Sequence, residues 1–308
     1  MTERRLRIGT RASDLARWQA NWIADRLGGM GREVEIVHIS TKGDVSSQPL
    51  GTIGGQGLFT KEIQRALLDD EIDLAVHSLK DLPTVPVDGL RLAAVPEREN
   101  AGDVLVSAEA HSVETLPQGA RIGTGSARRR AQLLFARGDL QVLDIRGNVG
   151  TRLRKLDDGQ YDAIVLAEAG MRRLNLEQRI THVIPKTVML PAVGQGALGI
   201  EARSEDRDTL EVLAGLNHPA SRAAASAERT MLAALQAGCL APVGVWARHD
   251  EDRLVLDSVV LSGDGSRRVA ADVAGPPDEA EELGRQAARE LLAQGAAELI
   301  AASRQTPK

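Results

Sequence analysis

The chain has 308 residues, 43% of them hydrophobic, and a formal net charge of −5. It is long enough to bury a substantial core and to form two or three domains. The negative charge and an aromatic content of only 2% argue against a general nucleic-acid-binding protein, because such proteins use basic surfaces and aromatic rings for base stacking.

Targeting and metal-binding signals are lacking in the sequence. The first residues form no apolar signal segment, and no later stretch reaches the roughly 18 uninterrupted apolar residues that a membrane helix needs. A single cysteine, Cys239, can form neither an internal disulfide nor a multi-cysteine metal site, which fits a reducing compartment. No His/Glu arrangement indicates zinc. We therefore expect a cytoplasmic protein with no metal, no nucleic acid and no membrane partner.

The first part of the chain alternates short apolar runs with amphipathic stretches, a rhythm typical of an α/β fold with largely parallel strands. Apolar residues recur at helical spacing from about Leu15 to Leu27, and Ser13 is placed to cap the first turn of this helix. A second helix is expected near Lys61 to Leu68. The strands expected here are LRIGT, VEIVHI, DLAVHSL and LRLAAV.

A second set of expected strands follows, DVLVS, ARIGTGS, LQVLDI and YDAIVLA, separated by helical sequence. The segments RIGTRAS (residues 7–13) and RIGTGSA (residues 121–127) echo one another, since each ends a strand with Gly-Thr and places a serine at a helix start. This echo predicts two similar α/β lobes around a cleft, as in periplasmic binding proteins. Each lobe would present a helix N-terminus, whose free N–H groups attract anions.

The last third of the chain changes character. The Gly-rich segment AVGQGALGIEARS could return the chain to the first lobe, and an Ala-rich helix then runs to about Leu235. The segments VGVWARH, RLVLDSVVLS and SRRVAADVAG predict a three-stranded antiparallel sheet, followed by one or two helices. The expected domains are residues 1–97 completed by 195–215, residues 98–194, and a third, α+β domain of residues 216–308.

Positive charge is concentrated in the middle of the chain. Between Ala120 and Ile180, eleven Arg and one Lys stand against seven carboxylates, a local excess of +5. Arg128, Arg129 and Arg130 lie in the first turn of an expected helix, where cations oppose the helix dipole. A bound polyanion would offset that cost, and a solvated basic face is the alternative.

The segment HSLKDLP places Ser78, Lys80 and Asp81 where an apolar strand ends, which is where open α/β sheets bind ligands. The alternative is a Lys–Asp surface pair before a proline turn, and His77 is expected to have a structural role. The residues alone thus predict an arginine-lined cleft with one carboxylate and one accessible thiol, suited to a ligand with several carboxylates.

Cys239 has three interpretations. Most lone cysteines are small buried hydrophobes. A cysteine nucleophile would need a histidine base, and none of the six histidines lies in a recognisable partner motif, which disfavours a cysteine protease. The third interpretation is covalent attachment of a prosthetic group to a thiol on a Gly-flanked loop.

Seven segments together resemble the porphobilinogen deaminase (hydroxymethylbilane synthase) family of tetrapyrrole biosynthesis: RIGTRAS, GLFTKEI, AVHSLKDLP, IGTGSARRRAQL, IRGNVGTRL, LPAVGQGALGIEAR and ERTMLAALQAGCLAPVG. The resemblance covers nearly the whole chain. It implies an enzyme that condenses four porphobilinogens head to tail, with loss of ammonia, onto a dipyrromethane primer. Linear hydroxymethylbilane is then released by hydrolysis.

The resemblance also implies a role for individual residues, and it implies a monomer. Cys239 would hold the dipyrromethane cofactor through a thioether, and Asp81 would be the catalytic carboxylate. The residues expected to bind the cofactor are Ser78, Lys80, Ser126, Arg128 and Arg129. Those expected to bind substrate or the growing chain are Arg11, Ser13, Arg146, Arg152 and Arg173.

Three positions depart from the family pattern. Gln56 stands where many members have lysine, Gly150 where asparagine is common, and Ala237 where a second glycine is frequent. We expect Gly150 to loosen the start of its helix and Ala237 to restrict the cysteine loop. The main rival interpretation is a solute-binding module with the same two-lobed plan, but such a protein would need neither Cys239 nor a third domain.

Overall fold

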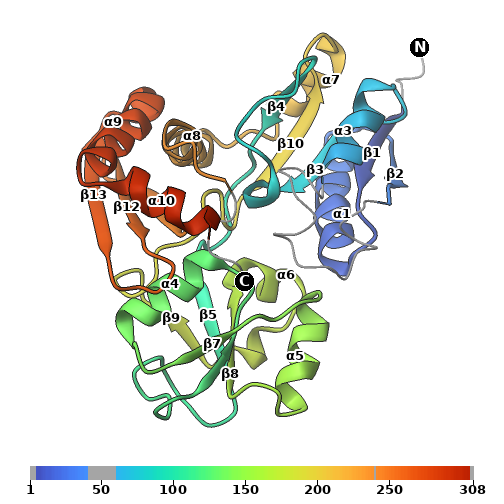
Figure 1. Cartoon of the computed structure of the whole chain (residues 1–308). Helices are drawn as coiled ribbons and strands as arrows, with labels where there is room; N and C mark the ends of the chain where they lie inside the picture. The colour runs from blue at the N-terminus through green and yellow to red at the C-terminus, as the bar shows by residue number, and fades with distance from the viewer. Residues whose placement is uncertain (1–4, 41–59, 239–240, 306–308) are drawn as a thin grey trace. The chain divides into compact units, whose positions relative to one another are not determined.

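The computed structural model describes residues 5–40, 60–238 and 241–305, and the chain folds into two compact units (Figure 1). The first unit comprises residues 1–98 and 197–222, and the second comprises residues 99–196 and 223–308. Among the described residues, no helix is long and apolar enough to cross a membrane.

A five-stranded sheet in the order β2-β1-β3-β10-β4 forms the centre of the first unit. Its elements are β1 (Leu6–Thr10), α1 (Asp14–Gly29), β2 (Val34–His38), α3 (Lys61–Leu68), β3 (Leu74–Ser78), β4 (Leu90–Ala94), β10 (Leu198–Arg203) and α7 (Arg207–Ala214). Side chains alternate between the two faces of the strands. One face packs against α1 and α7, and the other packs against α3.

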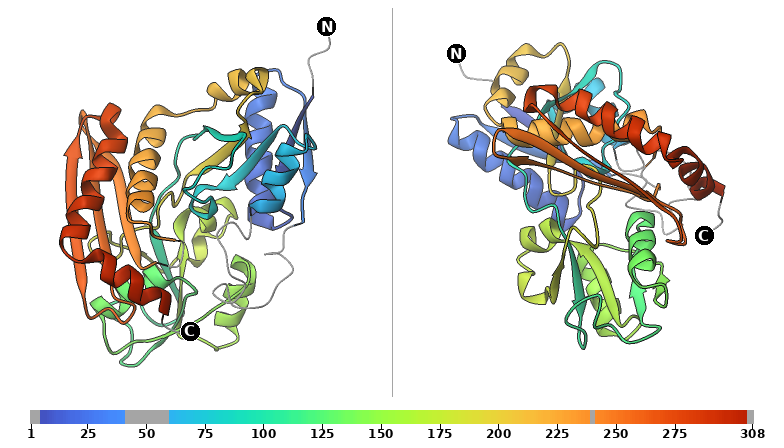
Figure 2. Two further views of the ribbon diagram at one scale, coloured as in Figure 1. Left: turned by 45° about the horizontal axis from the view of Figure 1, so that its top comes forward. Right: turned by 90° about the vertical axis from the view of Figure 1, so that its left-hand side faces the viewer.

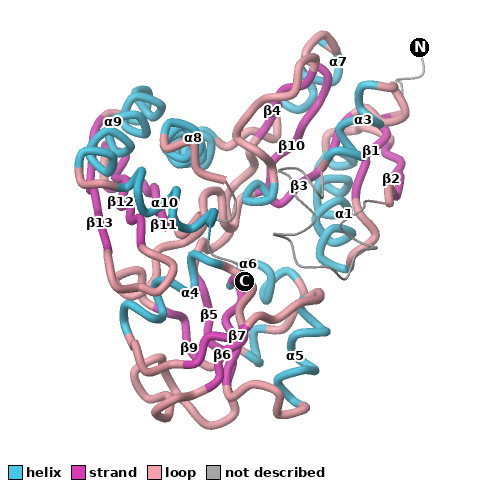
Figure 3. The backbone as a smooth tube through the Cα atoms, in the orientation of Figure 1, coloured by secondary structure: helices cyan, strands magenta, loops and turns pink. Residues whose placement is uncertain are grey.

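The second unit contains another five-stranded sheet, in the order β7-β6-β8-β5-β9. Its elements are β5 (Asp103–Ser107), β6 (Arg121–Gly123), α4 (Ala127–Ala136), β7 (Gln141–Leu143), α5 (Val149–Asp157), β8 (Ala163–Ala167), α6 (Glu168–Arg173) and β9 (His182–Ile184). Leu105 packs on the face covered by α4, whereas Val104 and Val106 pack on the face covered by α5 and α6. Figure 3 shows these strands between α4 on one side and α5 on the other.

The two sheets have the same topology, which confirms the lobes predicted from the sequence echo. In each sheet the first three strands in spatial order are parallel, and the fourth, β10 or β5, runs antiparallel to both neighbours. Each of these reversed strands is the first strand after the chain crosses from the other unit. Neither β5 nor β10 is reached through a helical crossover. Such a crossover is needed to place consecutive strands parallel to one another in a sheet. The expectation of largely parallel strands missed this reversal.

The C-terminal part of the chain forms the expected antiparallel sheet, β11-β12-β13, with helices packed on it (Figure 2). Its elements are α8 (Pro219–Ala234), β11 (Val243–Asp250), β12 (Arg253–Leu261), β13 (Arg268–Gly275), α9 (Ala280–Ala293) and α10 (Ala296–Gln305). Buried side chains of all three helices and all three strands form one hydrophobic cluster. The observed fold class is the predicted one, two similar α/β lobes and a C-terminal α+β part.

Candidate functional site

Asp81 lies in a short 3-10 helix, η1 (Leu79–Asp81), that directly follows the central strand β3. Leu79 is buried, and its N–H group donates a hydrogen bond of 3.0 Å to the carbonyl oxygen of Ala197. The side chains of Ser78, Lys80 and Asp81 are half-buried. The buried leucine therefore fixes the backbone of a turn that presents three polar side chains at the carboxyl end of β3.

Side-chain contacts on both sides of Ser78 support this turn. Gln19, on α1, donates a hydrogen bond of 2.8 Å from Nε2 to Ser78 Oγ. Because a hydroxyl is both donor and acceptor, Ser78 keeps its own proton for another partner. His77 Nε2 lies 3.0 Å from Glu201 Oε2, and Gln64 donates to the same carboxylate at 3.1 Å. His77 thus has the structural environment that the sequence suggested.

Arg11 and Ser13 follow β1, the parallel neighbour of β3, so they lie at the same edge of the sheet as Ser78 and Asp81. Ser13 is the N-cap of α1, as predicted, and its hydroxyl accepts a bond of 3.4 Å from the N–H of Ala16. Topology thus gathers the five candidate residues of the first unit at one edge.

In the second unit, Ser126 is the N-cap of α4 and accepts a bond of 3.4 Å from the N–H of Arg129. Arg128 and Arg129 follow it in the first helical turn. They are 4% and 6% exposed, which is unusual for arginine. Their charges therefore need partners within the protein or in a ligand.

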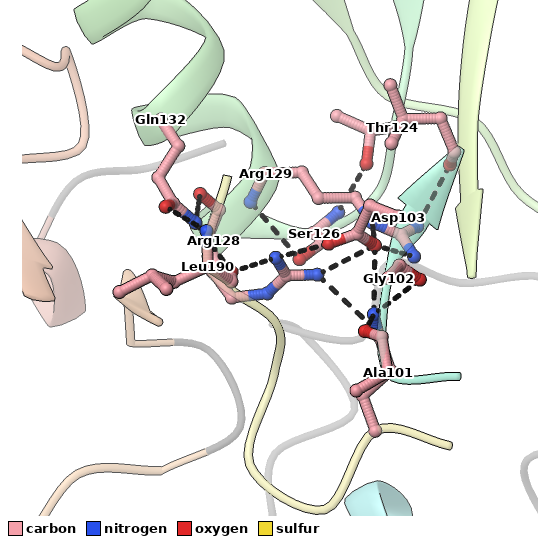
Figure 4. A network of polar contacts seen from close by, with 11 residues as sticks. Ala101, Gly102, Asp103, Thr124, Ser126, Arg128, Arg129, Gln132 and Leu190 are labelled. Atoms are coloured by element: carbon pink, nitrogen blue, oxygen red, sulfur yellow. Dashed lines mark hydrogen bonds and ion pairs between the residues drawn. The ribbon is translucent and has the colours of Figure 1, made fainter. Parts of the chain in front are cut away.

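The partner within the protein is Asp103, the first residue of β5, which is fully buried (Figure 4). Arg128 donates to it twice, from Nη1 at 2.7 Å and from Nη2 at 3.1 Å, and Arg129 donates from Nε at 2.8 Å. Burial alone would raise the pKa of Asp103, but the two arginine charges outweigh that effect and hold the pKa well below its usual range. Asp103 is therefore ionised at neutral pH.

Further polar groups surround this cluster. Gln195 Nε2 donates to the carbonyl oxygens of Ala101 and Gly102 and, at 3.2 Å, to Asp103 Oδ1. Arg128 Nη1 also donates to the carbonyl oxygen of Leu190, at 2.5 Å. One donor stays unused, because Arg128 Nε is buried and has no hydrogen-bond partner among the described residues.

Arg146 and Arg152 follow β7, which is parallel to β6 and ends at the same edge of the sheet as the start of α4. Arg146 Nε donates to Asp144 at 3.0 Å, while its Nη2 is buried without a partner in the described part of the chain. Arg152 Nε donates to the carbonyl oxygen of Gly147 at 2.8 Å. This edge therefore holds a second guanidinium with an unused buried donor.

Arg173, on α6, is buried, and its Nη2 donates a bond of 2.6 Å to the carbonyl oxygen of Gly196. Burial lowers the pKa of Arg173 to about 10, against the opposing charge of Glu99. The guanidinium nevertheless stays charged at neutral pH. Its position is set by the backbone of the segment that leads from the second unit back to the first.

Cys239 and Gln56 lie outside the described residues. Ala237, two residues before Cys239, is buried in the C-terminal hydrophobic cluster. Gly150 does not prevent a capped helix start, since Asn148 caps α5 by accepting from the N–H of Thr151 at 2.9 Å.

Sequence reasoning missed Gln19, Asp103 and Gln195, which hold the predicted residues in place. One signal could have indicated Asp103, because it opens the otherwise apolar strand DVLVS. A carboxylate buried in such a strand requires a cationic partner.

Comparison with solved structures finds proteins of low sequence identity. An ABC transporter periplasmic substrate-binding protein from Coxiella burnetii matches with a TM-score of 0.43 and 16% identity, covering 73% of this chain and 96% of that chain. An ancestral arginine-binding protein matches with a TM-score of 0.39 and 16% identity, covering 69% and 90%.

Curated relatives are far more similar in sequence. A porphobilinogen deaminase of Desulforudis audaxviator is 52% identical over 297 residues, 96% of each chain. One of Moorella thermoacetica is 47% identical over 298 residues, 96% of this chain and 95% of the relative. Residues 6–211 match the family model described as "Porphobilinogen deaminase, dipyromethane cofactor binding domain", and residues 223–293 match the model of the family's C-terminal domain. The chain belongs to the porphobilinogen deaminase family.

Proposed function

We propose that this chain condenses four porphobilinogen molecules head to tail onto a dipyrromethane primer and releases linear hydroxymethylbilane, with Asp81 as the catalytic carboxylate. The observation that carries the proposal is the match of the cofactor-binding domain model to residues 6–211. Every candidate site residue except Cys239 falls within that range.

The Asp81 carboxylate would act on the reacting pyrroles. Its position after a central strand suits a group that meets a ligand, because open α/β sheets bind ligands at the carboxyl ends of their strands. A carboxylate there can accept pyrrole N–H bonds and stabilise the cation that develops as ammonia leaves porphobilinogen. Such electrostatic stabilisation is often worth about 3–4 kcal/mol.

The cofactor would be held by Cys239 through a thioether and by Ser78, Lys80, Ser126, Arg128 and Arg129 through its carboxylates. Each pyrrole unit carries an acetate and a propionate, and arginine pairs with such groups through charge-assisted bonds. The unused buried donor of Arg128 supports this fit. When bound, the dipyrromethane supplies the free α-carbon to which the first substrate is joined.

Arg11, Ser13, Arg146, Arg152 and Arg173 would bind the carboxylates of incoming substrate and of the growing chain. The unused buried Nη2 donor of Arg146 supports an oxyanion partner at that position. As carboxylates accumulate during elongation, these guanidiniums would offset their mutual repulsion.

We also propose that the enzyme acts as a monomer in the cytoplasm, where a single thiol stays reduced.

The test is the stoichiometry of the reaction. The purified wild-type chain and a Cys239→Ser variant are incubated with porphobilinogen, and ammonia and linear tetrapyrrole are quantified. We expect the wild type to release four ammonia molecules for each tetrapyrrole and the variant to release none. Binding of porphobilinogen by the wild type without ammonia release would instead support a solute-binding module.

A further inference from the structure

Asp103 is shared by two neighbouring arginines of one helical turn. It lies at the start of β5, whereas Arg128 and Arg129 lie on α4, 25 and 26 residues further along the chain. Figure 4 shows both guanidiniums pointing toward the carboxylate from the same side of α4. One anion therefore sets the position of two cations.

The cluster carries more positive than negative charge. Two guanidiniums face one carboxylate, and the other groups bonded to them are neutral, namely Gln195 and the carbonyl oxygens of Leu190 and Val165. A buried excess charge is costly unless a further anion approaches it. The cluster therefore favours the arrival of one more negative group.

The hydrogen-bonding capacity of Arg128 leads to the same conclusion. A guanidinium has five N–H donors. The two terminal nitrogens of Arg128 bond to Asp103, Leu190 and Gln195, whereas Nε is buried and unpartnered among the described residues. Asp103 thus holds the side chain in a geometry that leaves one donor for a group outside the cluster.

Two further chain segments are bonded to this cluster, one to Asp103 through Gln195 and one to Arg128 through the carbonyl oxygen of Leu190. Gln195, next to the crossing at Gly196, bonds to Asp103 and to the backbone of Ala101 and Gly102. Gln132, one turn after Arg128, exchanges two hydrogen bonds with the backbone of Leu190, at 2.8 and 3.0 Å. The arginines are therefore held rigidly before any ligand binds, which reduces the entropy lost on binding.

We propose that Asp103 is a positioning residue for cofactor attachment: its carboxylate fixes Arg128 and Arg129 so that their remaining positive charge and the free Nε donor meet one carboxylate of the dipyrromethane. This inference rests on the proposed cofactor role of the two arginines. A purely structural ion pair would stabilise the fold but leave cofactor attachment unchanged.

The experiment compares attachment in folded protein. Wild type, Asp103→Asn and two control variants are produced in a host that makes porphobilinogen, and the folded fraction is weighed by mass spectrometry after denaturation. Leu105→Ala removes a buried side chain from the same strand, so it lowers stability without touching the arginines. Asp162→Asn removes the carboxylate that pairs with Arg121. We expect the fraction of chains carrying two linked pyrroles to fall at least tenfold in Asp103→Asn and to stay at the wild-type level in both controls.

A folded Asp103→Asn protein that carries the cofactor as fully as a loaded wild type would overturn the assignment of Asp103 alone. A bare wild-type chain would overturn the proposed function together with this inference. If Asp103→Asn does not fold, Asp103→Glu keeps the buried charge but displaces the carboxylate by one methylene. We then expect attachment from added porphobilinogen to be at least fivefold slower than in Leu105→Ala, and an equal rate would overturn the proposal.

Discussion

At the scale of single residues, the site consists of charged groups whose positions are set by buried neighbours. Leu79 fixes the turn that carries Asp81, Gln19 orients Ser78, and Asp103 holds Arg128 and Arg129. The groups proposed to meet the ligand are thus supported by side chains that do not meet it. Such support keeps a site preorganised for the charge that develops in the reaction.

Replacing Asp81 with asparagine keeps the size of the side chain and removes its charge. We expect kcat to fall by about 10² to 10³, because the cation formed as ammonia leaves loses its counter-ion. Thermal stability and cofactor content should stay close to the wild type, since Asp81 is only half-buried. Steady-state kinetics with porphobilinogen would measure the effect. A kcat close to that of the wild type would contradict the catalytic role of Asp81.

Replacing Arg128 with alanine removes the guanidinium with the unused donor. We expect the variant to attach the cofactor at least tenfold more slowly than wild type when porphobilinogen is added to cofactor-free protein. Arg130→Ala is the matched control, because Arg130 lies on the same helix but is exposed. An Arg128→Ala chain that still acquires a full cofactor at the wild-type rate would contradict the assignment.

The lowered pKa of Asp103 predicts a pH dependence of stability. Its folded pKa lies below the unfolded value of about 3.9, so the ionised carboxylate stabilises the fold above that value. This stabilisation is lost as the pH falls through the folded pKa. We expect the Tm difference between wild type and Asp103→Asn to be constant from pH 7 to about pH 5 and to shrink below about pH 4. A difference that stays constant to pH 3 would show that the carboxylate charge is not its source.

At the scale of elements, local signals predicted the structure well, and connections between distant segments were not predictable. The helix at Lys61–Leu68 and the Ser13 cap follow from spacing within a few residues. The reversal of β5 and β10 depends on which distant strands they pair with, and no local pattern encodes that pairing. The pairing of Asp103 with Arg128 could not be predicted for the same reason, because the two residues are 25 positions apart in the sequence and only the fold brings them together.

Two glycines near the start of α5 should respond oppositely to substitution by alanine. A Cβ at Gly150 would meet only Asn148 Oδ1, at 3.8 Å, so Gly150→Ala should stabilise the protein by about 0.5–1 kcal/mol. Gly147 has φ +111°, and a Cβ there would lie 2.6 Å from Thr151 Cγ2, so Gly147→Ala should cost more than about 1 kcal/mol. Urea unfolding of both variants measures these changes. Equal effects of the same sign would contradict the structure of this turn.

At the scale of the whole molecule, two lobes of equal topology each place a capped helix start and polar side chains at one sheet edge, with different chemistry. The first unit contains Arg11, Lys80 and Asp81, and the second contains the buried Arg128, Arg129 and Arg173. The carboxylate that we propose for the reaction and most of the arginines that we propose for ligand binding therefore belong to different units.

Covalent attachment of the cofactor to Cys239 is measured most directly by the mass of the intact, denatured chain beside that of a Cys239→Ser variant, both from a host able to make porphobilinogen. We expect the wild type to be heavier than its bare chain by two linked pyrroles and the variant to have the bare mass. A wild-type chain of bare mass would contradict the covalent primer on Cys239 and, with it, the proposed mechanism.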